Sequence, residues 1–155
     1  MTPLPPLIID LPPREAHPNA RKTWQARART VARYRKSAGE LVFAFAFEQF
    51  GRRPRFARAI IGLRFRFPKP RFGRAQFHDP DNLLAWAKSA IDALTDGGLL
   101  ADDRSIVYLP PEQELSADDV GQLLITVRPI VDGTCPFCGA AQCETTTEPA
   151  NTPAS

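Results

Sequence analysis

The apolar positions of the chain fall into two helical patterns and four extended ones. From Trp24 onward apolar residues return every three or four positions, and the same spacing runs from Leu83 to Leu94, which predicts two amphipathic helices. Alternating apolar and polar residues over 57–67 predict a long strand. Three shorter apolar runs predict further strands, over residues 7–11, 105–109 and 123–127. We therefore expect an α+β fold, in which a small mixed β-sheet of about four strands is packed by two main helices.

The first predicted helix carries an apolar stripe that should face the core. Its members are Trp24, Ala28, Val31, Tyr34, Ala38, Leu41, Val42 and Phe45. The end of the helix, residues 43–50, is apolar nearly all round, so burial in the core and burial at a subunit interface both remain open. Most basic residues of the helix lie off the stripe, where they either follow a DNA backbone or face water; these are Arg27, Arg29, Arg33, Arg35 and Lys36.

The second predicted helix is bracketed by two acidic pairs. Before it stands Asp79-Pro80-Asp81; proline favours an extended residue ahead of it, which would place both carboxylates on one side. Asp81 or Asn82 suits the N-cap, and Gly97-Gly98 suits the helix end. The second pair, Asp102-Asp103, follows. If the chain folds back, the two pairs can meet at one point and hold Mg²⁺, which prefers oxygen ligands.

A purely structural interpretation of each part is also open. Asp-Pro-Asp-Asn before a helix is ordinary turn and cap chemistry, and Asp102-Asp103 could cap a turn. Lys88 and Asp92 are four residues apart, so they could form a plain surface ion pair worth a few tenths of a kcal/mol. The order and spacing of all the parts together favour a catalytic site over these separate explanations.

The combined pattern resembles the RusA family of Holliday-junction resolvases, which are common in bacteria and their prophages. The matching residues are Asp79-Pro80-Asp81-Asn82-Leu83, Lys88, Asp92-Ala93-Leu94, Gly98-Leu99-Leu100 and Asp102-Asp103, with an N-terminal echo in Leu11-Pro12-Pro13, Pro18-Asn19-Ala20-Arg21 and Trp24. The resemblance implies that Asp79, Asp81 and Asp103 bind Mg²⁺ or Mn²⁺, with Asp102 as a lesser metal ligand. It also implies that Lys88 assists catalysis beside the three acids.

Two positions depart from the family pattern. Lys88 lies seven residues after Asp81, whereas the founding pattern has four. Both spacings return to one helical face, but seven places the lysine about one turn, ~5 Å, further along. His78 stands where a basic residue is usual, so it either keeps the charge, carries protons, or is a bystander.

The net charge of +3 hides a strong asymmetry along the chain. Residues 1–75 hold 17 Lys and Arg against 4 Asp and Glu, and residues 76–155 hold 3 against 13, so the halves carry +13 and −10. A basic half attracts phosphates, while an acidic half can hold a cation. The predicted DNA-binding residues are Arg27, Arg33 and Arg35 on the first helix, and Lys69, Arg71 and Arg74 in the loop before the acids. Arg64 and Arg66 on the long strand either face nucleic acid or sit on a sheet surface.

The C-terminal part forms a separate segment. We expect a RusA-like endonuclease domain over residues 1–131 and a tail over 132–155 whose end is disordered. Cys135-Pro136-Phe137-Cys138-Gly139 has the look of a zinc knuckle, and Cys143 is a candidate third ligand. Structural Zn²⁺ takes four ligands, so a fourth beyond the three cysteines would come either from the distant His17 or from a partner chain.

The predicted function is a Mg²⁺-dependent endodeoxyribonuclease that resolves Holliday junctions or other branched DNA by hydrolysing phosphodiester bonds. The resemblance implies a homodimer, since a four-way junction is cut in paired strands. The alternative is a non-catalytic phage accessory protein that binds branched DNA; the long basic segment argues against a phosphohydrolase of small nucleotides. No run of about 18 apolar residues and no secretory signal are present, so we expect no membrane span and a cytoplasmic location.

Overall fold

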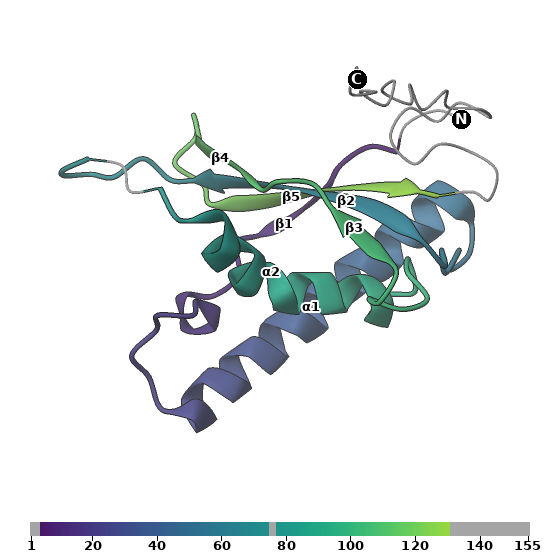
Figure 1. The fold of residues 1–155 in the computed structure, drawn as a ribbon, viewed down its shortest axis with the longest axis horizontal. Helices are drawn as coiled ribbons and strands as arrows, with labels where there is room; N and C mark the ends of the chain where they lie inside the picture. The colour runs from purple at the N-terminus through teal and green to yellow at the C-terminus, as the bar shows by residue number, and fades with distance from the viewer. Residues whose placement is uncertain (1–3, 75–76, 131–155) are drawn as a thin grey trace, which may run out of the picture.

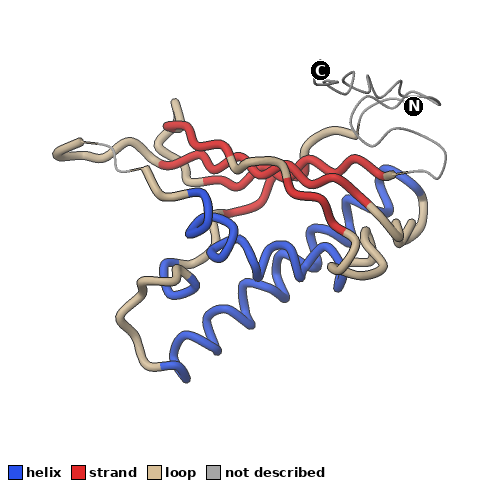
Figure 2. The backbone as a smooth tube through the Cα atoms, in the orientation of Figure 1, coloured by secondary structure: helices blue, strands red, loops and turns tan. Residues whose placement is uncertain are grey.

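The chain folds into two layers, a β-sheet and a pair of helices that cover one of its faces (Figures 1 and 2). The computed structural model describes residues 4–74 and 77–130. In chain order the elements are β1 (Leu7–Asp10), a short 3-10 turn (Arg14–Ala16), α1 (Trp24–Phe50), β2 (Ala59–Phe67), α2 (Pro80–Asp96), β3 (Ile106–Tyr108), β4 (Glu112–Leu115) and β5 (Gln122–Pro129). The predicted α+β class is confirmed.

The sheet is mixed and is built on the two longest strands, β2 and β5. Its order is β1-β5-β2-β3, and β5 runs antiparallel to both β1 and β2. On the other edge of β2, β3 pairs with Ala59–Ile61 and β4 with Arg64–Phe67, both in parallel. One edge of β2 thus receives two short strands, one after the other, and α2 is the connection that reaches the first of them.

The sheet has five strands rather than about four. The extra one, β4, lies in the acidic segment between the predicted strands 105–109 and 123–127. Its sequence, Glu-Gln-Glu-Leu, has no apolar alternation to reveal it. It forms because the exposed edge of β2 offers backbone partners and because Glu112 and Glu114 pair with Arg64 and Arg66 across the two strands.

The core lies between the sheet and the helices. Ile61, Leu63 and Phe65 of β2 point inward, as strand alternation predicts, and they meet the apolar stripe of α2. The apolar residues that recur at helical spacing from Leu83 to Leu94 are all buried, namely Leu83, Trp86, Ala87, Ala90, Ile91 and Leu94. β1 and β5 complete the layer with Leu7, Ile9, Leu123, Ile125 and Val127.

The predicted inward face of α1 is partly wrong. Ala38 and Val42 are buried, but Trp24 is 75% exposed and Leu41 is 46% exposed. Trp24 is exposed because it is the first residue of α1, about three turns before Arg35, which contacts α2. Leu41 fails because small residues make the helix contact, which shifts the buried stripe toward Gly39 and Ala46. The apolar end of α1 is also divided: Ala46 is buried, whereas Phe43 and Phe47 remain 38% and 45% exposed.

The two helices approach most closely where α1 passes the C-terminal end of α2. A Cβ atom on Gly97 would lie 2.5 Å from Val42 Cγ1 and 2.9 Å from the Gly39 carbonyl oxygen. Gly97 is therefore required by close packing. The next residue, Gly98, has φ +81°, a left-handed conformation that ends the helix as predicted.

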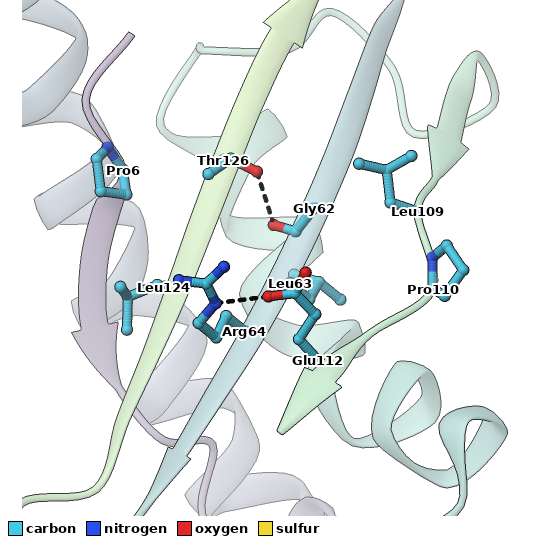
Figure 3. A pocket seen from close by; sticks show the side chains of 9 residues that line it. All are labelled: Pro6, Gly62, Leu63, Arg64, Leu109, Pro110, Glu112, Leu124 and Thr126. Atoms are coloured by element: carbon cyan, nitrogen blue, oxygen red, sulfur yellow. Dashed lines mark hydrogen bonds and ion pairs between the residues drawn. The ribbon is translucent and has the colours of Figure 1, made fainter. Parts of the chain in front are cut away.

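No described element covers the other face of the sheet. The centre of that face holds a small hollow of about 160 Å³ above Gly62, because this residue has no side chain and Thr126 closes over it (Figure 3). Arg64 and Glu112 form an ion pair beside it, with Nε and Oε2 2.6 Å apart. Arg64 and Arg66 thus lie on the sheet surface, paired with carboxylates.

Candidate active site

The first acidic pair sits at the start of α2. Asp79 is the N-cap, with φ −64° and ψ 143°, and Pro80 is the first helical residue. Both the N-cap prediction of Asp81 or Asn82 and the shared extended geometry of the two acids are therefore wrong. The reason is that proline suits the first helical position, so the helix starts two residues early and Asp81 lies within its first turn.

The carboxylates of Asp79 and Asp81 are exposed and without partners among the described residues. Asp79 makes no side-chain cap hydrogen bond, and neither side chain accepts a hydrogen bond or forms an ion pair there. Negative charge at a helix N-terminus is favoured by the unpaired N–H groups and the helix dipole. The chain thus holds two oxygen-rich side chains open to solvent at an electropositive helix end.

The residue before this pair is held by two hydrogen bonds from one side chain. The backbone N–H of His78 donates to Gln113 Oε1 at 2.7 Å, and Gln113 Nε2 donates to the His78 carbonyl oxygen at 2.8 Å. The Gln113 amide therefore fixes the peptide that enters Asp79. Gln113 was missed at the sequence level, and no local pattern signals it, because its partner lies 35 residues away on a different element.

An aromatic cluster anchors the same end of α2. Trp86 donates its indole N–H to the Pro13 carbonyl oxygen at 2.9 Å, and its ring stacks on Phe65 and Phe67. His17 and His78 pack against Trp86 and against each other, with imidazole centroids 5.1 Å apart. Burial and then the neighbouring His78 lower the pKa of His17. The His78 ring is part of this packing, while its backbone leads into Asp79.

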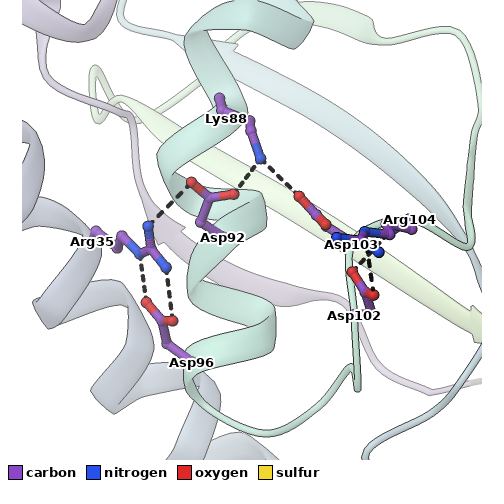
Figure 4. A network of polar contacts seen from close by, with 7 residues as sticks. All are labelled: Arg35, Lys88, Asp92, Asp96, Asp102, Asp103 and Arg104. Atoms are coloured by element: carbon purple, nitrogen blue, oxygen red, sulfur yellow. Dashed lines mark hydrogen bonds and ion pairs between the residues drawn. The ribbon is translucent and has the colours of Figure 1, made fainter.

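Lys88 connects the helix to the second acidic pair (Figure 4). Its ammonium donates to Asp103 Oδ2 at 3.0 Å and also to Asp92 Oδ1. The hydrogen bonds to Asp92 and Asp103 raise the pKa of Lys88, and the bond from Lys88 lowers the pKa of Asp103. The lysine is thus a cation at neutral pH. Its side chain points toward the C-terminal half of α2, whereas Asp81 lies seven residues, about 10 Å along the axis, toward the start.

Arg35 extends this network to α1. It donates to both oxygens of Asp96, at 2.5 and 2.8 Å, and to Asp92 Oδ2 at 3.3 Å (Figure 4). The guanidinium of Arg35, which was predicted to contact DNA, therefore binds two carboxylates of α2. Asp102 turns away from Lys88 and accepts the backbone N–H of Arg104 at 3.1 Å, which is the turn-capping role left open above.

The remaining predicted DNA-contacting residues lie in different settings. Arg27 donates to the Ala16 carbonyl oxygen at 3.2 Å, and Arg33 is exposed on α1. Lys69, Arg71 and Arg74 are exposed in the arm between β2 and α2 (Figure 1). The arm also presents Phe72, 92% exposed, and Phe77, 60% exposed, in the segment that leads to the acids. The candidate zinc ligands Cys135, Cys138 and Cys143 lie outside the described residues.

The acids fit a magnesium ion in chemistry, but they do not form a closed cluster. Within residues 4–74 and 77–130, no group of three His, Cys, Asp or Glu side chains is placed to hold a metal ion. Mg²⁺ commonly takes only one or two carboxylates and keeps water and substrate phosphate as its other ligands. Asp79 and Asp81 are two such carboxylates with no partner among the described residues, whereas Asp103 is bonded to Lys88.

Comparison with models of known protein families and with curated proteins finds no match to this chain. The likeness to RusA resolvases therefore rests on the motif alone. In the described part of the chain, no helix combines the length and the apolarity needed to cross a membrane.

Proposed function

We propose that the protein is a Mg²⁺- or Mn²⁺-dependent endonuclease that cuts branched DNA, with Holliday junctions as the leading substrate. It would act in the cytoplasm as a homodimer, one protomer for each of two paired cuts. The observation that carries the proposal is the contact between Lys88 and Asp103, since it joins the two halves of the motif across 15 residues of sequence. A chance likeness of sequence would not require these side chains to meet.

Asp79 and Asp81 are the residues that would hold the metal ion, because their carboxylates are exposed and unpaired in the described structure. When bound, the ion would stabilise the charge that builds on the scissile phosphate and activate a water molecule. Gln113 would contribute by fixing the His78 peptide, which sets the direction in which Asp79 leaves the chain.

Lys88 would supply a permanent positive charge on α2, about 10 Å along the helix axis from Asp81. Its raised pKa keeps the ammonium protonated, so it acts as an electrostatic group and a hydrogen-bond donor rather than as a base. Asp92 and Asp103 hold the ammonium from two sides, and Arg35 holds Asp92 in turn. Asp103, which the motif also assigns to the metal, is the residue that holds Lys88 from the far side of the network.

DNA affinity would come from the basic arm and from α1. Lys69, Arg71 and Arg74 stand within ten residues of Asp79 along the chain, so the arm would hold phosphates of the same DNA molecule that is cut. The exposed rings of Phe72 and Phe77 offer surfaces on which unpaired bases at a branch point can stack.

A second candidate, a branched-DNA-binding protein without catalysis, is favoured by one observation. Asp103, a proposed metal ligand, is held by Lys88 in an ion pair. This candidate predicts junction binding with no cleavage at any metal concentration.

Three variants distinguish the two candidates: Asp79→Asn, Asp81→Asn and Asp103→Asn. If the protein is a nuclease, each abolishes cleavage of a labelled four-way junction while binding persists, because Asn removes charge but little volume. Asp118→Asn, on the exposed turn after β4, is the matched control and should cleave normally. A variant that cleaves like the wild type removes its residue from the proposed site.

A further inference from the structure

A groove runs along α1 on the side of the polar network. It has a volume of about 640 Å³, within the range of about 300–1,000 Å³ usual for ligand sites. Six of its lining residues recur with the period of one face of α1, and they are Ala32, Arg35, Lys36, Gly39, Glu40 and Phe43. Arg53 from the loop after α1, and Asp96 and Gly97 at the end of α2, form the other wall.

The groove combines an apolar floor with a cationic rim. Ala32, Gly39, Gly97 and the ring of Phe43 supply the floor, and Phe43 is 38% exposed. The Arg53 guanidinium lies over that ring, with Cζ 4.7 Å from its centroid. Flat aromatic and guanidinium surfaces are the groups on which unstacked nucleobases stack.

The charges of the groove favour an anionic ligand. The Arg35–Asp96 pair is internally neutralised. That leaves Lys36 and Arg53, which form no ion pair among the described residues, against Glu40 alone. Arg52 and Arg55 flank Arg53 in an exposed loop and add positive charge at one end.

The groove is also linked by hydrogen bonds to Lys88. Arg35 lines the groove and donates to Asp92, whose other oxygen accepts from Lys88. A strand bound in the groove would thus lie beside the network that holds Lys88.

From these observations we propose that the groove binds single-stranded nucleic acid, namely unpaired nucleotides that leave the branch point of the substrate. A continuous duplex offers phosphates but keeps its base faces stacked, so its bases cannot contact an apolar floor beside a cation–aromatic pair. An unpaired strand offers phosphates to the cations and base faces to the apolar floor. This inference deepens the proposed nuclease function and rests on it for the identity of the substrate.

The test is the binding of a labelled oligothymidylate of about ten nucleotides, measured by fluorescence anisotropy with a metal chelator present. Phe43→Ala should weaken binding about 5- to 150-fold, the usual range for loss of one stacked base. Leu41→Ala, which truncates an exposed apolar residue outside the groove, should bind within about twofold of the wild type.

A second pair of variants separates the groove from the overall charge of the protein. Ala32→Glu places a carboxylate on the floor, and Ala44→Glu places the same charge elsewhere on the exposed surface of α1. Only Ala32→Glu should lose oligothymidylate binding, while duplex binding by the two should stay equal. Thermal melts check that both variants fold. Their stabilities should lie close to that of the wild type, because the helix itself tolerates either glutamate within a few tenths of a kcal/mol.

Three results would overturn the inference. These are equal loss in Ala32→Glu and Ala44→Glu, wild-type binding by Phe43→Ala, and displacement of the oligonucleotide by a polyglutamate peptide at equal charge, which would assign the groove to acidic peptides. If the wild-type protein cleaves junctions but binds no oligothymidylate, the proposal for the groove is refuted and the nuclease proposal stands. If it binds oligothymidylate through the groove and never cleaves, the nuclease proposal alone is refuted.

Discussion

Replacing Gln113 tests how the structure positions the acidic pair. Its amide both accepts the His78 N–H and donates to the His78 carbonyl oxygen, in a partly buried setting between β4 and the start of α2. Gln113→Glu keeps the acceptor and the shape but replaces the donor with an oxygen. An ionised carboxylate would then face the His78 carbonyl oxygen at the distance of a hydrogen bond, without a proton between them.

The magnitude follows from the two bonds. Leaving one partly buried carbonyl unsatisfied costs about 1–3 kcal/mol, and two opposed oxygens add repulsion. A loss of this size should lower the melting temperature by several degrees for a chain of this length. Gln113→Ala, which loses both bonds and adds no repulsion, should fall in the same range of about 1–3 kcal/mol.

The pH dependence distinguishes this cause from a general effect of the mutation. In the folded state, repulsion by the His78 carbonyl oxygen raises the pKa of the introduced carboxyl group above the ordinary Glu value of about 4.3. A protonated carboxyl can donate to the carbonyl, as the amide does. The variant should therefore approach wild-type stability below about pH 4.3 and lose that stability as the pH rises through the raised pKa.

The assay is a thermal melt of wild type and variant across pH, followed by junction cleavage at a temperature where both are folded. Gln122→Glu is the control, because its side chain lies on β5, across β2 from β4, and makes no hydrogen bond among the described residues. Cleavage should fall in Gln113→Glu beyond any loss of folded protein, since Asp79 is no longer held. A stability difference that is the same at all pH values would refute the two-bond explanation.

Four further predictions concern the lysine, the salt response, the helix crossing and the pH profile. Lys88→Ala should slow single-turnover cleavage by about 10²–10³-fold with little change in melting temperature, and Lys88→Arg should rescue it only partly; an unchanged rate would leave the lysine a surface partner of Asp92. DNA binding should fall by roughly a thousandfold between 50 and 200 mM salt if six or more phosphates are contacted, and a flat response would exclude the basic half as the binding surface. Gly97→Ala should lower the free energy of unfolding by about 1–3 kcal/mol in denaturant titrations, because its Cβ would overlap Val42, and an unaffected stability would contradict the close crossing. Lys88 holds the pKa of Asp103 below its ordinary 3.8, and the pKa of Lys88 lies above its ordinary 10.5. The ion pair should therefore persist from below pH 3.8 to above pH 10.5. A change in cleavage rate between pH 5 and 9 that disappears in Lys88→Ala would contradict this.

The elements with strong periodicity could be predicted from the sequence, and those formed by tertiary pairing could not. The apolar stripe of α2 and the alternation of β2 each carry a single dominant period, so both elements form, and the stripe of α2 and the inward residues Ile61, Leu63 and Phe65 of β2 are buried. β4 has no such period. One signal for it was available: Arg64 and Arg66 have the same two-residue spacing as Glu112 and Glu114 and carry the opposite charge.

The same limit applies to the candidate site. The spacing of acids and lysine identified Lys88 and Asp103, and the structure brings these two together. The sequence could not identify Gln113, nor the ion pairs of Arg35 with Asp92 and Asp96, because each contact depends on a side chain from a distant element. On α1 the prediction of the buried face failed where small residues, rather than large apolar ones, make the contact.

The central claim is metal-dependent cleavage of branched DNA, and one measurement tests it most directly. Wild-type protein is incubated with a labelled four-way junction and with a linear duplex of the same sequence, each with Mg²⁺ and with a chelator. We predict paired cuts near the branch point of the junction in Mg²⁺, none in chelator, and little or no cutting of the duplex. A junction that is bound but uncut at every Mg²⁺ and Mn²⁺ concentration would contradict the claim.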